Sequence, residues 1–201
     1  LDLGRDRAHL SAAQRRRLRD LQAEALDYLI QVFTEDETNT PRDLTVFLEE
    51  IGAERYTERV LVRLALTYMD QARYDFGIEC YRLLLERSPA DERAPAWQQQ
   101  VAAGFAAVDE PEHVLEELGR LADTYLPGGP WAVQQTDAEV VIEAHARIER
   151  ALRVRAMRWH ELGQRDSSVP RFEQAVLAYE LYLAHFSGAP EAYTLRFYRA
   201  E

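Results

Sequence analysis

Residues 57–90 read TERVLVRLALTYMDQARYDFGIECYRLLLERSPA and contain two helical patterns of apolar and small residues. Within each pattern these residues recur at steps of three and four, which places them on one helix face. The two sets are Leu61, Leu64, Ala65 and Tyr68, followed by Tyr74, Gly77, Tyr81 and Leu84. Pro89 cannot continue a helix and therefore marks the end of the second one. We predict an antiparallel helix pair, with Thr57 as the N-cap of its first helix.

Weaker copies of this pair follow along the chain. The patterns predict a degenerate repeat at residues 94–127, a repeat with one long helix at residues 136–190, and the start of a further repeat at residues 191–201. Their face residues are Val101, Ala102, Phe105, Val114, Leu118 and Leu121, and then Leu152, Ala156, Trp159, Phe172, Ala175, Tyr179 and Tyr182. We expect Thr136 and Glu139 to form a capping box that opens the long helix. That helix should extend to about Glu161, with a long loop over residues 163–170.

The N-terminal part predicts a degenerate hairpin over residues 11–52. Ser11 and Gln14 have the spacing of a capping box, and an acidic segment over residues 34–40 interrupts the helical pattern. Pro41 then opens a short helix that Gly52 closes. The expected apolar stripe of the first helix is Leu18, Leu21, Ala25, Leu26, Leu29, Val32 and Phe33. Residues 1–201 are therefore predicted to form a single all-α domain of helix pairs.

The spacing of the signature residues in residues 57–90, Pro89 included, resembles the tetratricopeptide repeat (TPR). The resemblance implies a right-handed superhelical solenoid of antiparallel helix pairs, a fold that binds proteins or peptides. In that family the first helix of each repeat lines the concave face, and the implied groove residues are Arg59, Val62, Leu66, Met69 and Asp70. Val62 and Leu66 replace the Lys/Asn clamp of chaperone-binding members. An apolar groove suits a partner helix or an extended apolar segment, or is filled by the protein's own next helix.

A second resemblance concerns the setting. The repeat spacing of about 37 residues, the long helix and the final residues TLRFYRAE (194–201) are similar to bacterial envelope repeat proteins of the outer-membrane-assembly lipoprotein and gliding-motility types. This implies a periplasmic or outer-membrane-associated scaffold that meets the membrane only through partners or a lipid anchor. The alternative is a cytosolic regulatory or peptide-sensing module of a larger protein, which the single Cys80 and the acidic balance favour.

Composition limits the class of partner. The chain has 201 residues, of which 47% are hydrophobic, and a formal net charge of −11. The negative charge argues against nucleic acid, because binding there depends on neutralising phosphates. No run approaches the roughly 20 apolar residues that cross a bilayer. Other proteins or peptides are the expected partners. The chain begins at Leu1 rather than Met and ends in a helical pattern, so we expect a fragment of a longer protein.

The long helix carries a stripe of arginines, hereafter the arginine stripe, at Arg147, Arg150, Arg155 and Arg158. One interpretation is a solvated face with local pairs, such as Glu143 with Arg147 one turn later. The other is a docking strip for an acidic partner or a carboxylate.

Two single residues also have alternative interpretations. Cys80 is either a semi-buried structural thiol or a reactive one, which would need a cationic neighbour. Trp131 lies in the turn-rich segment LPGGPWAVQQT (126–136) and either packs against the helices or anchors a partner.

No catalytic pattern is present in the sequence. The histidines, His9, His113, His145, His160 and His185, form none of the zinc-binding spacings. His113 with Glu117, and His145 with Glu149, stand one turn apart, as neighbouring turns of an acidic helix often produce. Carboxylate pairs such as Glu116 and Glu117 are interpreted as solvated helix faces. We predict that the protein is not an enzyme and holds no metal or cofactor; the competing hypothesis is an enzyme with an unrecognised site.

Overall fold

The computed structural model of this protein describes residues 11–36 and 38–200, and every regular element in these ranges is helical. The α-helices are α1 (Ala12–Glu35), α2 (Pro41–Glu50), α3 (Thr57–Asp70), α4 (Tyr74–Arg87), α5 (Ala94–Ala107), α6 (Pro111–Tyr125), α7 (Ala138–Asp166), α8 (Val169–Phe186) and α9 (Ala192–Ala200). Two 3₁₀-helices, η2 (Glu54–Tyr56) and η3 (Ala132–Gln134), precede α3 and α7. The all-α prediction is confirmed for these residues. None of the described helices has both the length and the apolar character that a membrane crossing requires.

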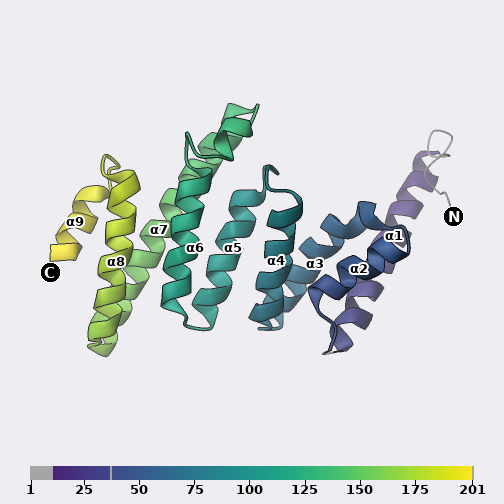
Figure 1. The fold of residues 1–201 in the computed structure, drawn as a ribbon, viewed down its shortest axis with the longest axis horizontal. Helices are drawn as coiled ribbons and strands as arrows, with labels where there is room; N and C mark the ends of the chain where they lie inside the picture. The colour runs from purple at the N-terminus through teal and green to yellow at the C-terminus, as the bar shows by residue number, and fades with distance from the viewer. Residues whose placement is uncertain (1–10, 37, 201) are drawn as a thin grey trace.

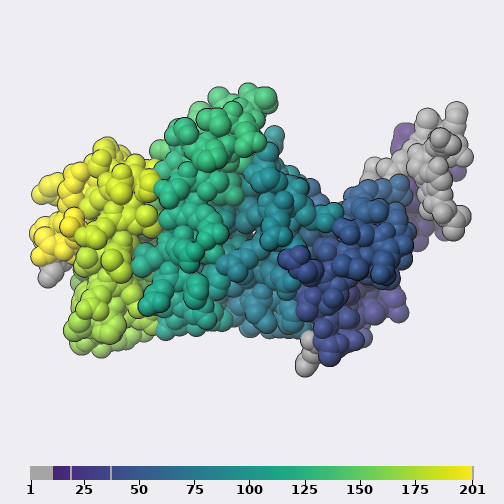
Figure 2. Space-filling view, viewed as in Figure 1, coloured from purple at the N-terminus to yellow at the C-terminus, as the bar shows by residue number. Residues whose placement is uncertain are grey.

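The helices form an elongated row in chain order, with the described ends of the chain at opposite ends of the row (Figure 1). From α2 onwards each helix packs against the next one along the chain. Alternate helices also touch, α1 with α3 and α5 with α7, and likewise α2 with α4 and α6 with α8. The odd-numbered and even-numbered helices therefore lie in two layers. Figure 2 shows α8, α6, α4 and α2 succeeding one another across one face of the row.

The signature residues of residues 57–90 form the interior of this row. The buried residues among them are Leu61, Leu64, Ala65, Tyr68, Gly77, Tyr81 and Leu84. Two of the predicted core residues are not buried. Tyr74 is only half-buried at the start of α4, and Pro89 is exposed in the turn after α4. Pro89 acts through its missing N–H, which ends the helix, and needs no burial for that.

Helix ends follow the predicted capping in part. Ser11 and Gln14 form the expected capping box of α1. Thr57 is not an N-cap, because it is already the first residue of α3 and Tyr56 precedes it without a side-chain cap. The predicted capping box of Thr136 and Glu139 is also wrong. Asp137 caps α7, and its carboxylate accepts a hydrogen bond of 2.9 Å from the backbone N–H of Glu139.

The long helix α7 continues past the predicted end at Glu161 to Asp166. Gly163 lies inside this helix, and its lack of a side chain makes room for Phe172 of α8, since a Cβ atom at Gly163 would come within 2.9 Å of the ring. The helix ends at Ser167, which has the left-handed φ of +50°. The expected loop over residues 163–170 therefore shrinks to a tight connection between α7 and α8.

The apolar stripe of α1 is narrower than predicted. Ile30 and Phe33 are its buried residues, and Leu26 and Leu29 pack partly against the same core. These four positions follow the i, i+3, i+4, i+7 rule for one helix face. Leu21, Ala25 and Val32 of the predicted stripe are exposed, because α1 contacts the row along that one side.

A buried carboxylate joins three helices, contrary to the solvated face predicted for it. Glu117 of α6 is 2% exposed and accepts hydrogen bonds from Arg82 of α4 at 2.7 Å and from Gln98 of α5 at 2.6 Å. Arg120 adds an ion pair at 3.6 Å. The carboxylate is thus satisfied on both oxygens, which is the condition under which a charge is tolerated in an interior.

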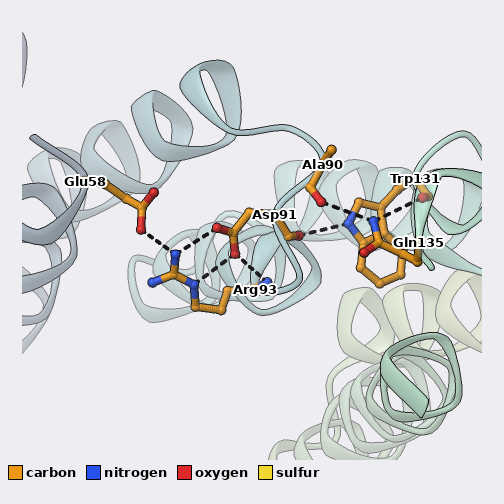
Figure 3. A network of polar contacts seen from close by, with 6 residues as sticks. All are labelled: Glu58, Ala90, Asp91, Arg93, Trp131 and Gln135. Carbon is orange, nitrogen blue, oxygen red and sulfur yellow. Dashed lines mark hydrogen bonds and ion pairs between the residues drawn. The ribbon is translucent and has the colours of Figure 1, made fainter. Parts of the chain in front are cut away.

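The turn-rich segment before α7 is fixed to the turn between α4 and α5 (Figure 3). Trp131 is 1% exposed, and its indole N–H donates a hydrogen bond of 2.9 Å to the carbonyl of Asp91. Gln135 donates another to the carbonyl of Ala90 at 3.1 Å. The guanidinium of Arg93 bridges the carboxylates of Asp91 and Glu58, so the network reaches α3. Trp131 therefore packs against the helices, and its alternative role as a partner anchor is wrong.

Truncation of Tyr81 should test the interior packing. We expect Tyr81→Ala to lower the free energy of unfolding by about 3–5 kcal/mol, because it leaves a cavity among buried side chains. Since each helix depends on its neighbours, the loss should extend to the adjoining helices. The measurement is urea denaturation followed by circular dichroism. Tyr193→Ala is the control, because Tyr193 is 79% exposed, and it should change stability by less than about 0.5 kcal/mol.

Trp131→Phe should test the connection between the two turns. The variant removes the indole N–H and leaves the carbonyl of Asp91 without that donor, which we expect to lower stability by about 1–3 kcal/mol. Val133→Ala in the same segment is the control, since Val133 is 71% exposed. Equal unfolding midpoints for the two variants would contradict the structural role of the indole.

Candidate functional site

The predicted groove residues lie on α3, but they do not share one environment. Arg59, Leu66 and Asp70 are exposed, whereas Val62 and Met69 are half-buried and pack against the core. Met69 lies over α4, where a Cβ atom at Gly77 would come within 2.7 Å of its Sδ. Met69 is therefore mainly a packing residue. The protein's own helices therefore fill some of the predicted groove, which is one of the two alternatives that the sequence left open.

A better-defined hollow lies one step further along the same layer, between α5 and α7. Its volume is about 220 Å³. Gln99, Ala102 and Ala103 of α5 form one side, and Val114 and Leu118 of α6 form its base. Arg150, Ala151, Val154 and Arg155 of α7 complete the lining. We call this hollow the α5–α7 pocket; its floor is apolar and two guanidinium groups belong to its wall.

The members of the arginine stripe have different partners. Arg147 donates a hydrogen bond of 3.3 Å to the side-chain oxygen of Gln99, across from α7 to α5. Arg155 lies over the ring of Trp159, at 5.5 Å from its centre. Arg158 pairs with Glu161 at 3.6 Å on the surface. Within the described part of the chain, no carboxylate oxygen lies within 4.0 Å of Arg147, Arg150 or Arg155.

The local pairing that would explain the arginine stripe as a solvated face is largely missing. Glu143 makes no ion pair with Arg147 among the described residues. Glu149 instead accepts hydrogen bonds of 2.9 Å from Arg153 and from the hydroxyl of Tyr182. Burial, and secondarily the charge of Arg158, lower the pKa of the Arg155 guanidinium below its ordinary value. An anion beside Arg155 would stabilise the charged guanidinium and so offset the lowering of the pKa by burial and by Arg158.

A larger hollow of about 900 Å³ lies at the other end of α7, where α7, α8 and α9 meet. Its lining is mainly apolar and includes Phe172, Leu177 and Tyr198. His160 is 7% exposed there, and its Nε2 atom is buried without a hydrogen-bond partner among the described residues. Phe172 and Tyr198 pack against the imidazole at ring-centre distances of 5.5 and 5.0 Å. The sequence predicted no site here, because His160 belongs to none of the zinc-binding spacings.

The described residues contain no group of three or more side chains suited to a metal ion. His113 lies 3.0 Å from Glu110 rather than beside Glu117, and it stacks on Phe105. His145 contacts the ring of Phe186. His9 lies outside the described residues. His113, His145 and His160 are thus held in separate aromatic contacts, and His185 lies 3.8 Å from the carboxylate of Asp123.

Cys80 is fully buried in α4. Burial, and secondarily the nearby Glu79, raise the pKa of its thiol above the ordinary value. A raised pKa leaves little thiolate, so the structure favours the structural thiol over the reactive one.

Comparison with models of protein families, with curated proteins and with solved structures finds no match to this chain. The functional argument therefore depends on the helix arrangement and on the chemistry of the described surfaces.

Alkylation should distinguish the two roles of Cys80. We expect iodoacetamide to label Cys80 in the folded protein at least about tenfold more slowly than in urea, because the native thiol is buried and protonated. The native rate should also show little increase when the pH is raised from about 7 to about 9, across the usual range of thiol ionisation. Rapid labelling of the folded protein at neutral pH would restore the reactive interpretation.

Proposed function

We propose that this protein is a non-enzymatic protein-interaction scaffold built of TPR-like helix pairs, arranged as a right-handed solenoid. The observation that carries the proposal is the recurrence of one packing pattern in three successive pairs, α3/α4, α5/α6 and α7/α8. The residues buried at corresponding positions are Ala65, Tyr81 and Leu84, then Ala102, Leu118 and Leu121, then Ala156, Tyr179 and Tyr182. Such pairs cannot bury their apolar faces alone, so stacking in series is their stable arrangement.

The layer of odd-numbered helices is the proposed binding face. Exposed Leu66 on α3 and the α5–α7 pocket lie on this layer and present apolar surface beside charged groups. A surface that combines apolar anchors with a charged rim is typical of protein interfaces. The partners that it suits are proteins or peptides. The net charge of −11 supports the exclusion of nucleic acid.

The absence of catalysis is part of the proposal. The described histidines do not converge, and the thiol of Cys80 is buried with a raised pKa. The buried thiol also removes one of the two features that favoured a cytosolic sensing module, and the acidic balance is the one that is left. The resemblance to envelope repeat proteins in repeat spacing, in the long helix and in residues 194–201 is the ground for proposing a bacterial envelope complex, with the scaffold as a periplasmic or outer-membrane-associated component.

Affinity capture from envelope extracts should test the scaffold. We expect the tagged protein to recover a defined partner, and Leu66→Asp to lose most of it, because a carboxylate on the odd-numbered layer disrupts an apolar contact. Val46→Asp is the matched control: Val46 lies on the even-numbered α2, and both side chains are 48% exposed. Recovery of no partner, or identical recovery by Leu66→Asp and the wild type, would contradict the proposal.

A further inference from the structure

Positive charge gathers on α7 in a chain that is acidic overall. Arg147, Arg150 and Arg155 have no carboxylate within 4.0 Å among the described residues, although the whole chain carries a net charge of −11. Of the acidic groups on α7, Glu149 pairs with Arg153 and Glu161 with Arg158, the last member of the arginine stripe. A run of guanidinium groups that the protein itself does not neutralise is complementary to a negatively charged ligand.

The same groups border an apolar hollow. The small side chains of Ala102 and Ala103 on α5 leave space beneath Arg150 and Arg155, and Val114 and Leu118 of α6 close the base. The resulting volume of about 220 Å³ is sufficient for one aliphatic side chain rather than for a whole cofactor. The pocket therefore combines a small apolar anchor site with two charge-assisted hydrogen-bond donors at its rim.

We propose, on the basis of the scaffold function above, that the α5–α7 pocket binds an internal acidic segment of a partner protein, in which each aliphatic residue is flanked by Asp or Glu. The aliphatic side chain occupies the pocket, and the flanking carboxylates pair with Arg150 and Arg155. Each guanidinium presents a planar fork of N–H donors that matches a carboxylate.

The spacing of the arginines favours several carboxylates over a single one. At 1.5 Å per residue, Arg150 and Arg155 are separated by about 7.5 Å along the helix axis, and Arg147 and Arg158 by about 16 Å. A single terminal carboxylate would need both long side chains to converge on it, whereas two separate carboxylates can each pair with one guanidinium. In an extended segment, the residues directly before and after an aliphatic residue are about 6–7 Å apart, which is close to the inner spacing, and they point to the face opposite to it. Arg150 and Arg155 would therefore pair with these carboxylates from the rim, on either side of the segment.

The test uses a synthetic peptide of four Glu-Leu-Asp units, acetylated and amidated so that only side chains carry charge, titrated calorimetrically into the full chain. We expect saturable binding. A peptide of Gln-Leu-Asn units should bind at least about tenfold more weakly, because each charge-assisted pair is lost. Arg150→Glu with Arg155→Glu should weaken binding of the acidic peptide to a similar degree. Val154→Trp, which fills the pocket without changing charge, should do so as well.

The matched control is Arg15→Glu with Arg16→Glu, an equal change of net charge at exposed positions of α1. It should alter the affinity by less than about threefold, since surface charges at a distance are screened by salt. Equal weakening by the control, or equal binding of the neutral peptide, would overturn the proposal. So would dimerisation of the wild type that Arg150→Glu with Arg155→Glu abolishes, because the occupant would then be a second copy of this chain.

Failure here is distinguishable from failure of the scaffold function. If envelope capture remains sensitive to Leu66→Asp while the acidic peptide does not bind, the scaffold stands and only the acidic ligand is wrong. Circular dichroism melts of the arginine and Val154 variants verify that each one is folded. If Arg155→Glu unfolds the chain, Arg150→Glu and Val154→Trp still decide the result, because Arg150 and Val154 are exposed.

Discussion

Burial of each helix against the helices beside it is the constraint that holds this protein in its shape. Leu61, Leu121 and Leu152 belong to different helix pairs, yet each is at most 1% exposed to solvent. No single pair encloses such residues on all sides, so the interior exists only between neighbours. The buried Glu117 extends the same dependence to polar groups, because its hydrogen-bond donors come from α4 and α5.

The sequence predicted the helices wherever their apolar faces are periodic, and it was less successful at their ends. The core residues around Leu64 and Tyr81 could be predicted because they recur at steps of three and four on one face of each helix. The end of α7 could not be predicted in this way. Gly163 was expected to begin a loop, and its packing against the ring of Phe172 from α8 is visible only in the structure. Likewise, the sequence predicted a solvated carboxylate at Glu117, because its hydrogen-bond donors Arg82 and Gln98 lie on other helices.

At the candidate site, too, features of a single helix could be predicted from the sequence, whereas contacts between helices could not. The arginine stripe was visible from its helical spacing, but the sequence allowed Glu143 to neutralise it. Only the structure assigns Glu149 to Arg153 and Tyr182 and sets Arg150 beside the alanines of α5. The α5–α7 pocket is formed by side chains of three successive helices, α5, α6 and α7, so the pattern of no single helix could have revealed it.

Rigidity and binding are connected through these inter-helix contacts. The turn before α5 is fixed by Arg93 and Trp131, and α7 begins directly after the segment that Trp131 anchors. The two walls of the α5–α7 pocket therefore start from one cross-linked network (Figure 3). A site whose walls are positioned in advance binds a ligand with less loss of conformational entropy. A peptide with a few carboxylates and one aliphatic anchor gains only a small contact area, and for such a ligand this preorganisation decides whether binding is measurable.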